Sequence, residues 1–387
     1  MHRRILACLV VLSLSLHPAF GQQLAAQAGF DVKAAQVYLI EAGTGTVLFA
    51  RNEDQVVPAA SLAKLMTAAV VFKALSAGET GLDTEYPVTE HAWRTGGAPS
   101  RTATMFAALK SNVRVEDLVR GVTVQFANDA CIILAEGLTG SETAFAARMT
   151  EEARALGLTK STFANATGLP HPENRVTMRE MVLLARHLQH TYPQRMGYYT
   201  EPEFEWNRIR QRNRNPLLAL DIGVDGFVTG FSEEGGYSIV ASIRRDGKRL
   251  LLAMGGLESD KQRVEETRRI LEWGLSSFAR RTLFQEGEAI AEASVYGGDA
   301  GKVPLVAGER VDVFLPVDNS QRLSARVVYT WPIRAPVEPG TEVGRLRISN
   351  DRQVLREVPV KTAGSVGVGT LRARALDALI ELLFFWI

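Results

Sequence analysis

The sequence has few cysteines and no excess of charge of either sign. Two cysteines occur in 387 residues, and Cys8 lies in the apolar N-terminal stretch, so Cys131 alone remains beyond it. A single thiol forms no intrachain disulfide, and no histidine and cysteine cluster has zinc-ligand spacing, so we expect neither a metal nor a cofactor. Lysine and arginine total 44 against 43 aspartate and glutamate. That balance provides no basic field for phosphates, which argues against nucleic acid as a partner.

The N-terminal hydrophobic run is too short to cross a membrane. A basic start at His2 to Arg4 precedes an apolar run from Ile5 to Leu16. These features predict a secretory signal peptide over residues 1–21, with a retained N-terminal anchor as the alternative. Export without disulfides is typical of a bacterial periplasm, where disulfides are permitted but not required.

The length and the hydrophobic pattern predict two domains. A chain of 387 residues exceeds what one ordinary core holds. Residues 30–278 give the order hairpin, helices, hairpin, helix, which is typical of an α+β domain with an antiparallel sheet, flanking helices and a helical insertion. Over residues 280–362, short strand-like segments alternate with Gly and Pro, which predicts a separate small all-β domain. The segments are Ala289–Val295, Val311–Leu315, Leu323–Tyr329, Val343–Ser349 and Val354–Val360.

Several elements of the first domain have specific signals. Good helix formers without Gly or Pro run from Ser61 to Leu75, which predicts a helix. Ser141 is expected to cap a second helix, and Thr177 with Glu180 forms the pattern of a capping box. Apolar or alternating runs on both sides of Asp246-Gly247 predict a β-hairpin.

The last segment, residues 369–387, predicts an amphipathic helix. Arg374, Asp377 and Glu381 share one narrow face at a period of 3.6, while leucine and aromatic side chains occupy the rest. The segment is too short and too charged to span a bilayer, and its terminal aromatics suit a helix lying in a membrane interface. We therefore expect peripheral attachment to the inner membrane; a helix packed on its own domain is the alternative.

A serine and a lysine three residues apart are the first candidate for chemistry. Ser61-Leu62-Ala63-Lys64 places a hydroxyl and an amine on one helical face. Apolar surroundings lower the pKa of a lysine and let it take a proton from serine. The pair alone is weak evidence, because a capping serine beside a solvated lysine gives the same letters.

Further motifs accompany this pair in order along the chain: Pro58–Thr67, Val115–Gly121, Asn128–Ala130, Thr167–Pro170, Asn213–Asn215, Val224–Gly226, Thr229-Gly230 and Gly235–Tyr237. Together they resemble the motifs of the low-molecular-mass penicillin-binding proteins, which are serine-type D-Ala-D-Ala carboxypeptidases. The resemblance implies a β-lactamase/transpeptidase-like domain, a C-terminal β domain and a membrane-anchoring helix. It also implies a peptidoglycan pentapeptide as substrate and β-lactam antibiotics as covalent inhibitors.

Residue roles follow from the resemblance. It implies that Ser61 forms the acyl-enzyme, that Lys64 is its base, and that Asn128 orients the substrate amide. It also implies that the strand carrying Thr229 and Gly230 binds the peptide backbone and its terminal carboxylate.

Two positions depart from the family's motifs. The second motif, normally S-x-N, reads Phe126-Ala127-Asn128, and the third, normally K-T-G, reads Val228-Thr229-Gly230. The chain therefore lacks a hydroxyl that passes a proton to the leaving amine, which is worth about 10²–10⁴-fold. It also lacks a cation for the substrate carboxylate, which is worth about 10²–10³-fold. One arginine of a nearby series is a candidate replacement: Arg208, Arg210, Arg212 and Arg214.

Three functions remain open on the sequence. The first is a working carboxypeptidase that removes the terminal D-alanine of stem peptides through an acyl-enzyme on Ser61. The second is a catalytically impaired relative, since Phe126 is bulky and Val228 is uncharged. The third is a cell-wall binding or scaffolding protein without catalysis. A β-lactamase would form the same serine ester, but no deacylating carboxylate is identified.

Overall fold

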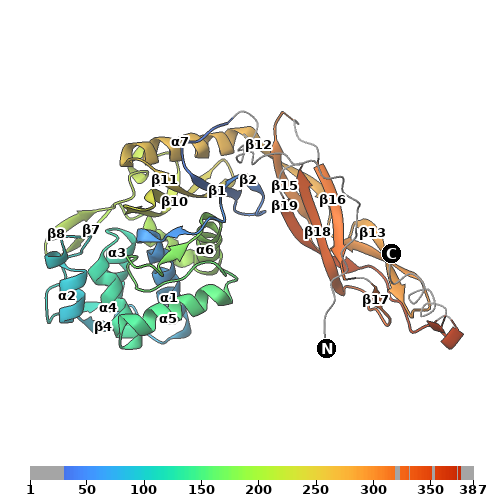
Figure 1. Ribbon diagram of the computed structural model, residues 1–387, viewed down its shortest axis with the longest axis horizontal. Helices are drawn as coiled ribbons and strands as arrows, with labels where there is room; N and C mark the ends of the chain where they lie inside the picture. The colour runs from blue at the N-terminus through green and yellow to red at the C-terminus, as the bar shows by residue number, and fades with distance from the viewer. Residues whose placement is uncertain (1–29, 319–322, 331, 351–353, 373, 376–387) are drawn as a thin grey trace, which may run out of the picture. The chain divides into compact units, whose positions relative to one another are not determined.

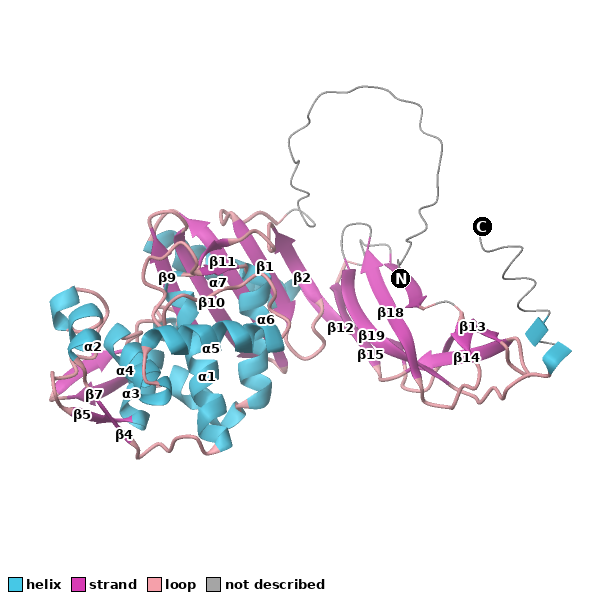
Figure 2. Cartoon of the chain, turned by 60° about the horizontal axis from the view of Figure 1, so that its bottom comes forward, coloured by secondary structure: helices cyan, strands magenta, loops and turns pink. Residues whose placement is uncertain are grey.

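The computed structural model describes residues 30–318, 323–330, 332–350, 354–372, 374 and 375. Figures 1 and 2 show a part of mixed helices and strands, followed along the chain by a part built of strands. The expected signal peptide, residues 1–21, lies outside the described residues, as do residues 373 and 376–387 of the expected C-terminal helix.

A five-stranded antiparallel sheet forms the centre of the first domain, in the order β2-β1-β11-β10-β9. The hairpin at the start of the domain joins the later strands because β1 pairs with β11. Asp246 and Gly247 turn β10 into β11 with φ of 52° and 73°, so the Asp-Gly hairpin is confirmed. This order leaves β9 at an edge of the sheet. The strands are β1 (Gln36–Glu41), β2 (Val47–Arg51), β9 (Val224–Ser232), β10 (Gly236–Arg245) and β11 (Lys248–Leu257).

Both faces of this sheet are covered by helices. Helix α7 (Asp260–Ser277) packs Gly274 against Leu39 and Leu250, where an added Cβ would come within 3.1 Å of both side chains. Ile40 and Leu251 alternate with these residues and belong to the core shared with the other helices. Figure 1 accordingly shows α7 on one side of the sheet and α1, α5 and α6 on the other.

The helical insertion lies between β2 and β9 along the chain. Its first helix buries ten of its 14 residues, and the stretch Ala60–Ala77 is the one helical segment within the described residues long and apolar enough to cross a membrane. Of this stretch, 72% is buried inside the domain, so a core position accounts for its composition. The helices are α1 (Lys64–Ala77), α2 (Glu90–Thr95), α3 (Val115–Thr123), α4 (Asn128–Thr139), α5 (Glu142–Ala155) and α6 (Met178–Thr191).

The helix caps follow the sequence signals with one exception. The Ser141 hydroxyl accepts a hydrogen bond from the Ala144 N–H at 3.1 Å, and Thr177 caps α6 by accepting from the Glu180 N–H at 3.2 Å. The Glu180 carboxylate, however, accepts a hydrogen bond from the buried Ser161 hydroxyl. The capping box is therefore half formed, because a tertiary donor takes the carboxylate.

Short elements tie the insertion together. The sequence predicts a helix beginning at Ser61; a 3₁₀ turn, η1 (Ala60–Ala63), precedes α1 instead. Three further turns are η2 (Ala98–Ser100), η3 (Pro193–Tyr199) and η4 (Leu218–Leu220). Three strand pairs are β3 (Val57–Pro58) with β6 (Arg175–Val176), β4 (Glu85–Pro87) with β5 (Asn112–Arg114), and β7 (Glu203–Trp206) with β8 (Ile209–Arg212).

The second domain is built of strands. One sheet has the order β16-β18-β19-β14-β13-β17, antiparallel except for the β13–β17 pair, and β12 pairs with β15. Alternate residues such as Leu346 and Ile348 are buried in its core. We propose the domain boundary at Ser277, where α7 ends and β12 follows directly. The strands are β12 (Phe278–Phe284), β13 (Ala289–Tyr296), β14 (Lys302–Ala307), β15 (Val311–Pro316), β16 (Leu323–Tyr329), β17 (Ile333–Arg334), β18 (Glu342–Asn350) and β19 (Val354–Thr362).

The expected fold class is confirmed: an α+β transpeptidase-like domain with a helical insertion, followed by a small all-β domain. Strands β12 and β14 were not predicted. The first carries Arg280 and Arg281, and the second carries Pro304, which has no N–H to donate to a ladder. The first sequence therefore lacks apolar alternation; the second has it at Val303, Leu305 and Ala307, but Pro304 argues against a strand.

Candidate active site

Ser61 lies in the tight turn that joins β3 to α1. Ala60, just before it, has a φ of 45°, in the left-handed region that costs a residue with a Cβ about 1 kcal/mol or more. Leu62 and Ala63 on the same turn are fully buried and anchor it in the core. The Ser61 side chain is half-buried and lines a cavity.

Lys64 is buried at 2% exposure and reaches back to the serine. Its Nζ donates to Ser61 Oγ at 3.1 Å and to the Thr167 carbonyl at 2.6 Å. Burial lowers the pKa of the Lys64 amine to about 8. The amine is therefore held beside the hydroxyl, with a protonation equilibrium near neutral pH.

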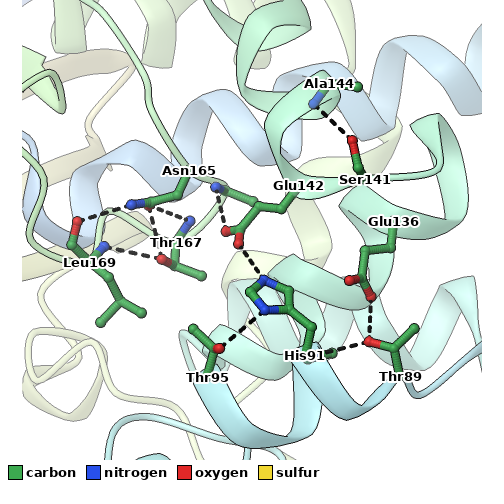
Figure 3. Close-up of polar contacts among 12 residues, drawn as sticks. Thr89, His91, Thr95, Glu136, Ser141, Glu142, Ala144, Asn165, Thr167 and Leu169 are labelled. Atoms are coloured by element: carbon green, nitrogen blue, oxygen red, sulfur yellow. Dashed lines mark hydrogen bonds and ion pairs between the residues drawn. The ribbon is translucent and has the colours of Figure 1, made fainter.

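The loop that supplies the Thr167 carbonyl is fixed by its own side chains, as Figure 3 shows. Asn165 Oδ1 accepts from the Thr167 and Gly168 N–H groups at 3.2 and 2.8 Å, and its Nδ2 donates to the Leu169 carbonyl at 3.1 Å. Gly168 has a φ of 78°, and a Cβ there would lie 1.7 Å from the Ala60 carbonyl oxygen. The Thr167-Gly168 motif thus requires glycine where the loop presses against the nucleophile turn.

A partly buried acid, Glu142, connects this loop to helix α2. Glu142 Oε1 accepts from the Ala166 N–H at 3.0 Å, and its Oε2 lies 3.0 Å from His91 Nε2 (Figure 3). The Ala166 carbonyl accepts from the Thr67 hydroxyl of α1 at 2.6 Å. Both the N–H and the carbonyl of Ala166 are therefore hydrogen-bonded. This restricts movement of Thr167, whose carbonyl accepts from Lys64.

Asn128 begins α4 and faces the same cavity. Its Nδ2 donates to the Thr102 hydroxyl at 2.9 Å, while its Oδ1 is buried without a hydrogen-bond partner among the described residues. Asp129, next to it, accepts from Thr104 Oγ1 at 2.6 Å and from the Met105 N–H at 3.0 Å, which fixes the loop that carries Thr102. A buried acceptor without a donor is unusual, so a ligand N–H is a natural partner for Asn128.

The edge of β9 forms the opposite wall. Thr229 and Gly230 line the cavity, and a Cβ on Gly230 would lie 3.4 Å from the backbone nitrogen of Ser61. Glycine therefore lets the strand approach the nucleophile turn closely. Val228 alternates with Thr229, is 2% exposed and belongs to the apolar core rather than to the cavity wall.

Phe126 contributes an apolar part of the wall. It has a φ of 53°, is 3% exposed and belongs to the same buried cluster as Val228. Both positions that depart from the family motifs are thus apolar and packed in one core. The lining residues that carry a hydroxyl are Ser61, Thr102, Thr167, Thr229 and Tyr237.

Two arginines face the cavity. Arg214 is exposed and lines it, whereas the rest of its series, Arg208, Arg210 and Arg212, does not. Arg263 of α7 also lines it and was missed by the sequence analysis. Its position one turn before Thr267 on the buried face of the helix is the signal that could have identified it.

Arg263 is fixed beside the edge strand β9. It is 7% exposed, donates from Nη1 to the Gly230 carbonyl at 3.2 Å, and forms an ion pair with Asp260. Its Nε is buried without a hydrogen-bond partner among the described residues, and its guanidinium lies 5.5 Å from the Tyr237 ring centroid. Burial lowers its pKa, yet an arginine stays charged at neutral pH.

These side chains surround one cavity of about 530 Å³. It contains the expected residues Ser61, Phe126, Asn128, Thr229 and Gly230; Lys64 lies behind Ser61. Within the part of the chain that the structure describes, no group of three His, Cys, Asp or Glu side chains is arranged to hold a metal ion. The arrangement offers a serine with a buried amine, an unpaired amide oxygen and two cations. It is suited to nucleophilic attack on an anionic peptide.

Two family models match the chain. The model described as D-alanyl-D-alanine carboxypeptidase matches residues 22–257, and the model of the penicillin-binding protein 5 C-terminal domain matches residues 278–367. Among curated proteins, D-alanyl-D-alanine carboxypeptidase DacC of Escherichia coli is 34% identical, over 92% of this chain and 90% of its own length. DacA of Haemophilus influenzae is 31% identical, over 89% and 88%.

Solved structures give the same assignment. Penicillin-binding protein 5 from Haemophilus influenzae has a TM-score of 0.75 at 30% identity, covering 88% of this chain and 99% of its own. Penicillin-binding protein D2 from Listeria monocytogenes in its cefotaxime-bound form has a TM-score of 0.59 at 28% identity, covering 65% and 100%. With both domains matched and the similarity extending over most of the chain, this protein belongs to the serine peptidase family of D-alanyl-D-alanine carboxypeptidases, the penicillin-binding proteins.

Proposed function

We propose that this protein removes the terminal D-alanine from peptidoglycan stem peptides through an acyl-enzyme on Ser61. The 3.1 Å contact between Lys64 Nζ and Ser61 Oγ at the cavity carries the proposal. Lys64 takes the hydroxyl proton as Ser61 Oγ attacks the carbonyl carbon of the penultimate D-alanine. The peptide C–N bond then breaks, D-alanine leaves with a proton, and water later cleaves the serine ester to release the shortened peptide.

The other side chains of the cavity hold the substrate. Asn128 Oδ1 has no hydrogen-bond partner among the described residues, so it is free to accept a substrate amide N–H. Arg263 and Arg214, which line the cavity, supply the positive charge for the terminal carboxylate in place of the lysine that the family has at position 228. Thr229, on the edge of β9, offers a hydroxyl to the same carboxylate.

Catalytic impairment is the second candidate, because Phe126 and Val228 are both buried and apolar. With Phe126 in place of a serine, the leaving amine lacks its usual proton donor, so slow acylation by the peptide is the signature of this alternative. The protein would then act in cell-wall binding or scaffolding.

We further propose a periplasmic location with peripheral attachment to the inner membrane. The basic and apolar N-terminal residues support export, and the amphipathic pattern of residues 369–387 supports attachment. Covalent reaction with β-lactams follows from the same serine chemistry, in keeping with the antibiotic-bound forms of the Listeria relative.

The first prediction tests the nucleophile. A fluorescent penicillin should label the mature protein at Ser61, and Ser61→Ala should abolish labelling without lowering the melting temperature. Labelling should be mapped by mass spectrometry of the digested adduct, with the half-exposed Ser232→Ala as a matched control that still labels. An adduct on another serine refutes the assignment.

The second prediction concerns pH. With a pKa of about 8, about one Lys64 amine in ten is neutral at pH 7, against fewer than one in about a thousand at the ordinary value near 10.4. Only the neutral amine accepts a proton, so the acylation rate should rise about tenfold per pH unit below pH 8 and level off above it. Arg214→Gln removes a positive charge that lowers this pKa, so the midpoint should move upward. Stopped-flow acylation measures the profile, and a flat profile from about pH 6 to 9 contradicts the role.

The third prediction concerns the two motif departures. Val228→Lys alone should lower the melting temperature, because it buries an ammonium in an apolar core. Phe126→Ser alone should also destabilise, by about 3–5 kcal/mol for the cavity it leaves. The double variant supplies both missing groups, a hydroxyl that protonates the leaving amine and a cation for the substrate carboxylate. Hydrolysis of a D-Ala-D-Ala peptide should then rise by at least about 10²-fold. A folded double variant that gains nothing, or a wild type already at about 1–10³ turnovers per second, rules out impairment at these positions.

The fourth prediction concerns the tail. Deleting residues 371–387 should release the protein from membrane fractions and leave its melting temperature unchanged, because the helix places its apolar area in lipid. Flotation with vesicles measures binding. A truncated protein that stays bound, or that melts several degrees lower, supports a helix packed on its own domain.

A further inference from the structure

Two hydroxyl groups connect the end of helix α2 to the Asn128 amide. Asn128 Nδ2 donates to Thr102 Oγ1 at 2.9 Å, and Thr102 Oγ1 lies 2.7 Å from Ser100 Oγ. Ser100 Oγ in turn donates to the Gly97 carbonyl, also at 2.7 Å. A continuous chain of hydrogen bonds therefore runs from the residues just beyond α2 to a side chain that lines the cavity around Ser61.

The direction of each hydrogen bond follows from the number of protons available. A serine hydroxyl has one proton, and a carbonyl oxygen has none to give. Ser100 Oγ and the Gly97 oxygen lie 2.7 Å apart, so the Ser100 proton must occupy this contact. Thr102 consequently gives its own proton to Ser100, because only this arrangement places a proton between both pairs of oxygens. The Thr102 oxygen is then an acceptor towards Asn128.

This direction decides how the Asn128 amide is oriented. With Thr102 as the acceptor, Nδ2 turns towards the threonine and Oδ1 is the end that the threonine does not bind. The reversed amide would place two oxygens against each other with no proton between them. Asn128 is 4% exposed, and its Oδ1 has no hydrogen-bond partner among the described residues. The chain of hydroxyls therefore leaves an acceptor, and not a donor, for a ligand.

The backbone holds these two hydroxyls in place. Arg101, between them, has a φ of 56°, in the left-handed region that is strained for a residue with a side chain. Gly96 lies against the start of α4, where an added Cβ would come within 2.4 Å of the Asp129 nitrogen. Figures 1 and 2 accordingly show α2 beside α4. The strained turn and the close contact together fix both hydroxyls relative to Asn128.

We propose that Thr102 and Ser100 are positioning residues that hold the Asn128 amide oxygen ready for a substrate N–H. The N–H is that of the penultimate D-alanine, the residue whose carbonyl Ser61 attacks. The site thereby selects an acyl group with an amide N–H over one with an oxygen in its place. The inference rests on the proposed function, since it takes the substrate from it. Neither hydroxyl exchanges a proton with the reacting atoms.

Binding to the intact Ser61→Ala protein tests the inference apart from catalysis. Two ligands are titrated by calorimetry: acetyl-D-Ala-D-Ala, and acetyl-D-lactoyl-D-Ala, in which an ester oxygen replaces the N–H of the penultimate residue. The first should bind about tenfold more tightly, the scale of one neutral hydrogen bond, because its N–H meets the amide oxygen. The ester oxygen would meet the same amide oxygen without a proton between them.

Variants at Thr102 give the decisive comparison. Thr102→Val keeps the shape but removes the acceptor, so the amide can turn round and the preference should fall to about twofold or less. Thr102→Ser should keep the tenfold preference. Thr102 is exposed, so Thr102→Val should leave the melting temperature unchanged. In an Asn128→Ala background, which removes the preference by itself, Thr102→Val should have no further effect.

A variant at Ser100 separates the chain of hydroxyls from a single contact. Ser100→Ala releases the Thr102 proton, which can then be donated to a reversed Asn128 amide, so the preference should fall about threefold although Thr102 is intact. Ser111→Ala is the matched control and should keep the tenfold preference. Ser111 Oγ donates to the Ala108 carbonyl at 2.7 Å, again three residues back, but Ser111 does not line the cavity.

The outcomes separate this inference from the function on which it builds. Equal affinities for the two ligands in Ser61→Ala, no measurable binding of either, or a preference that survives Thr102→Val overturn the positioning role, whatever the wild type hydrolyses. A preference that depends on Thr102 and Ser100 supports it, even if the wild-type protein hydrolyses neither ligand and the carboxypeptidase proposal fails.

Discussion

The hydrogen bonds of one buried amine organise the site. Lys64 is almost fully enclosed, yet its Nζ reaches both Ser61 Oγ and the Thr167 carbonyl. A charged amine in that position would be costly, so burial favours the neutral form that accepts a proton. The two contacts also leave the amine little freedom, because the Thr167 carbonyl takes one hydrogen and directs the rest of the group at the serine.

The surroundings of Lys64 explain why several distant motifs accompany the serine. Gly168 allows the loop to touch the nucleophile turn, and Asn165 closes that loop on itself. Glu142 and the Thr67 hydroxyl bind the N–H and the carbonyl of Ala166 between them. The position of the Thr167 carbonyl thus depends on α1, α5 and, through His91, α2, so the whole helical insertion supports the contact between Lys64 and Ser61.

Phe126 and Val228 are apolar where the family motifs have polar residues, so the charge of the cavity must come from elsewhere in the fold. Phe126 and Val228 are packed in the same apolar core, and such a core tolerates neither a lone hydroxyl nor a lone ammonium well. The two arginines that line the cavity come from other elements: Arg263 lies on α7, and Arg214 precedes η4.

The sequence by itself determined the order of elements, the Asp-Gly hairpin, the helix caps at Ser141 and Thr177, and the family. Those signals are local, because turn residues, caps and motifs are identified from the spacing of residues along the chain. The sequence did not identify β14, because Pro304 argues against a strand there. It also did not identify the 3₁₀ turn at Ala60. Arg263 escaped notice because it lies 33 residues beyond Gly230, and only the packing of α7 on the sheet brings the two together. Which arginine reaches the cavity and which replaced residue is buried both depend on side chains from distant elements meeting in space, and only the tertiary structure decided them.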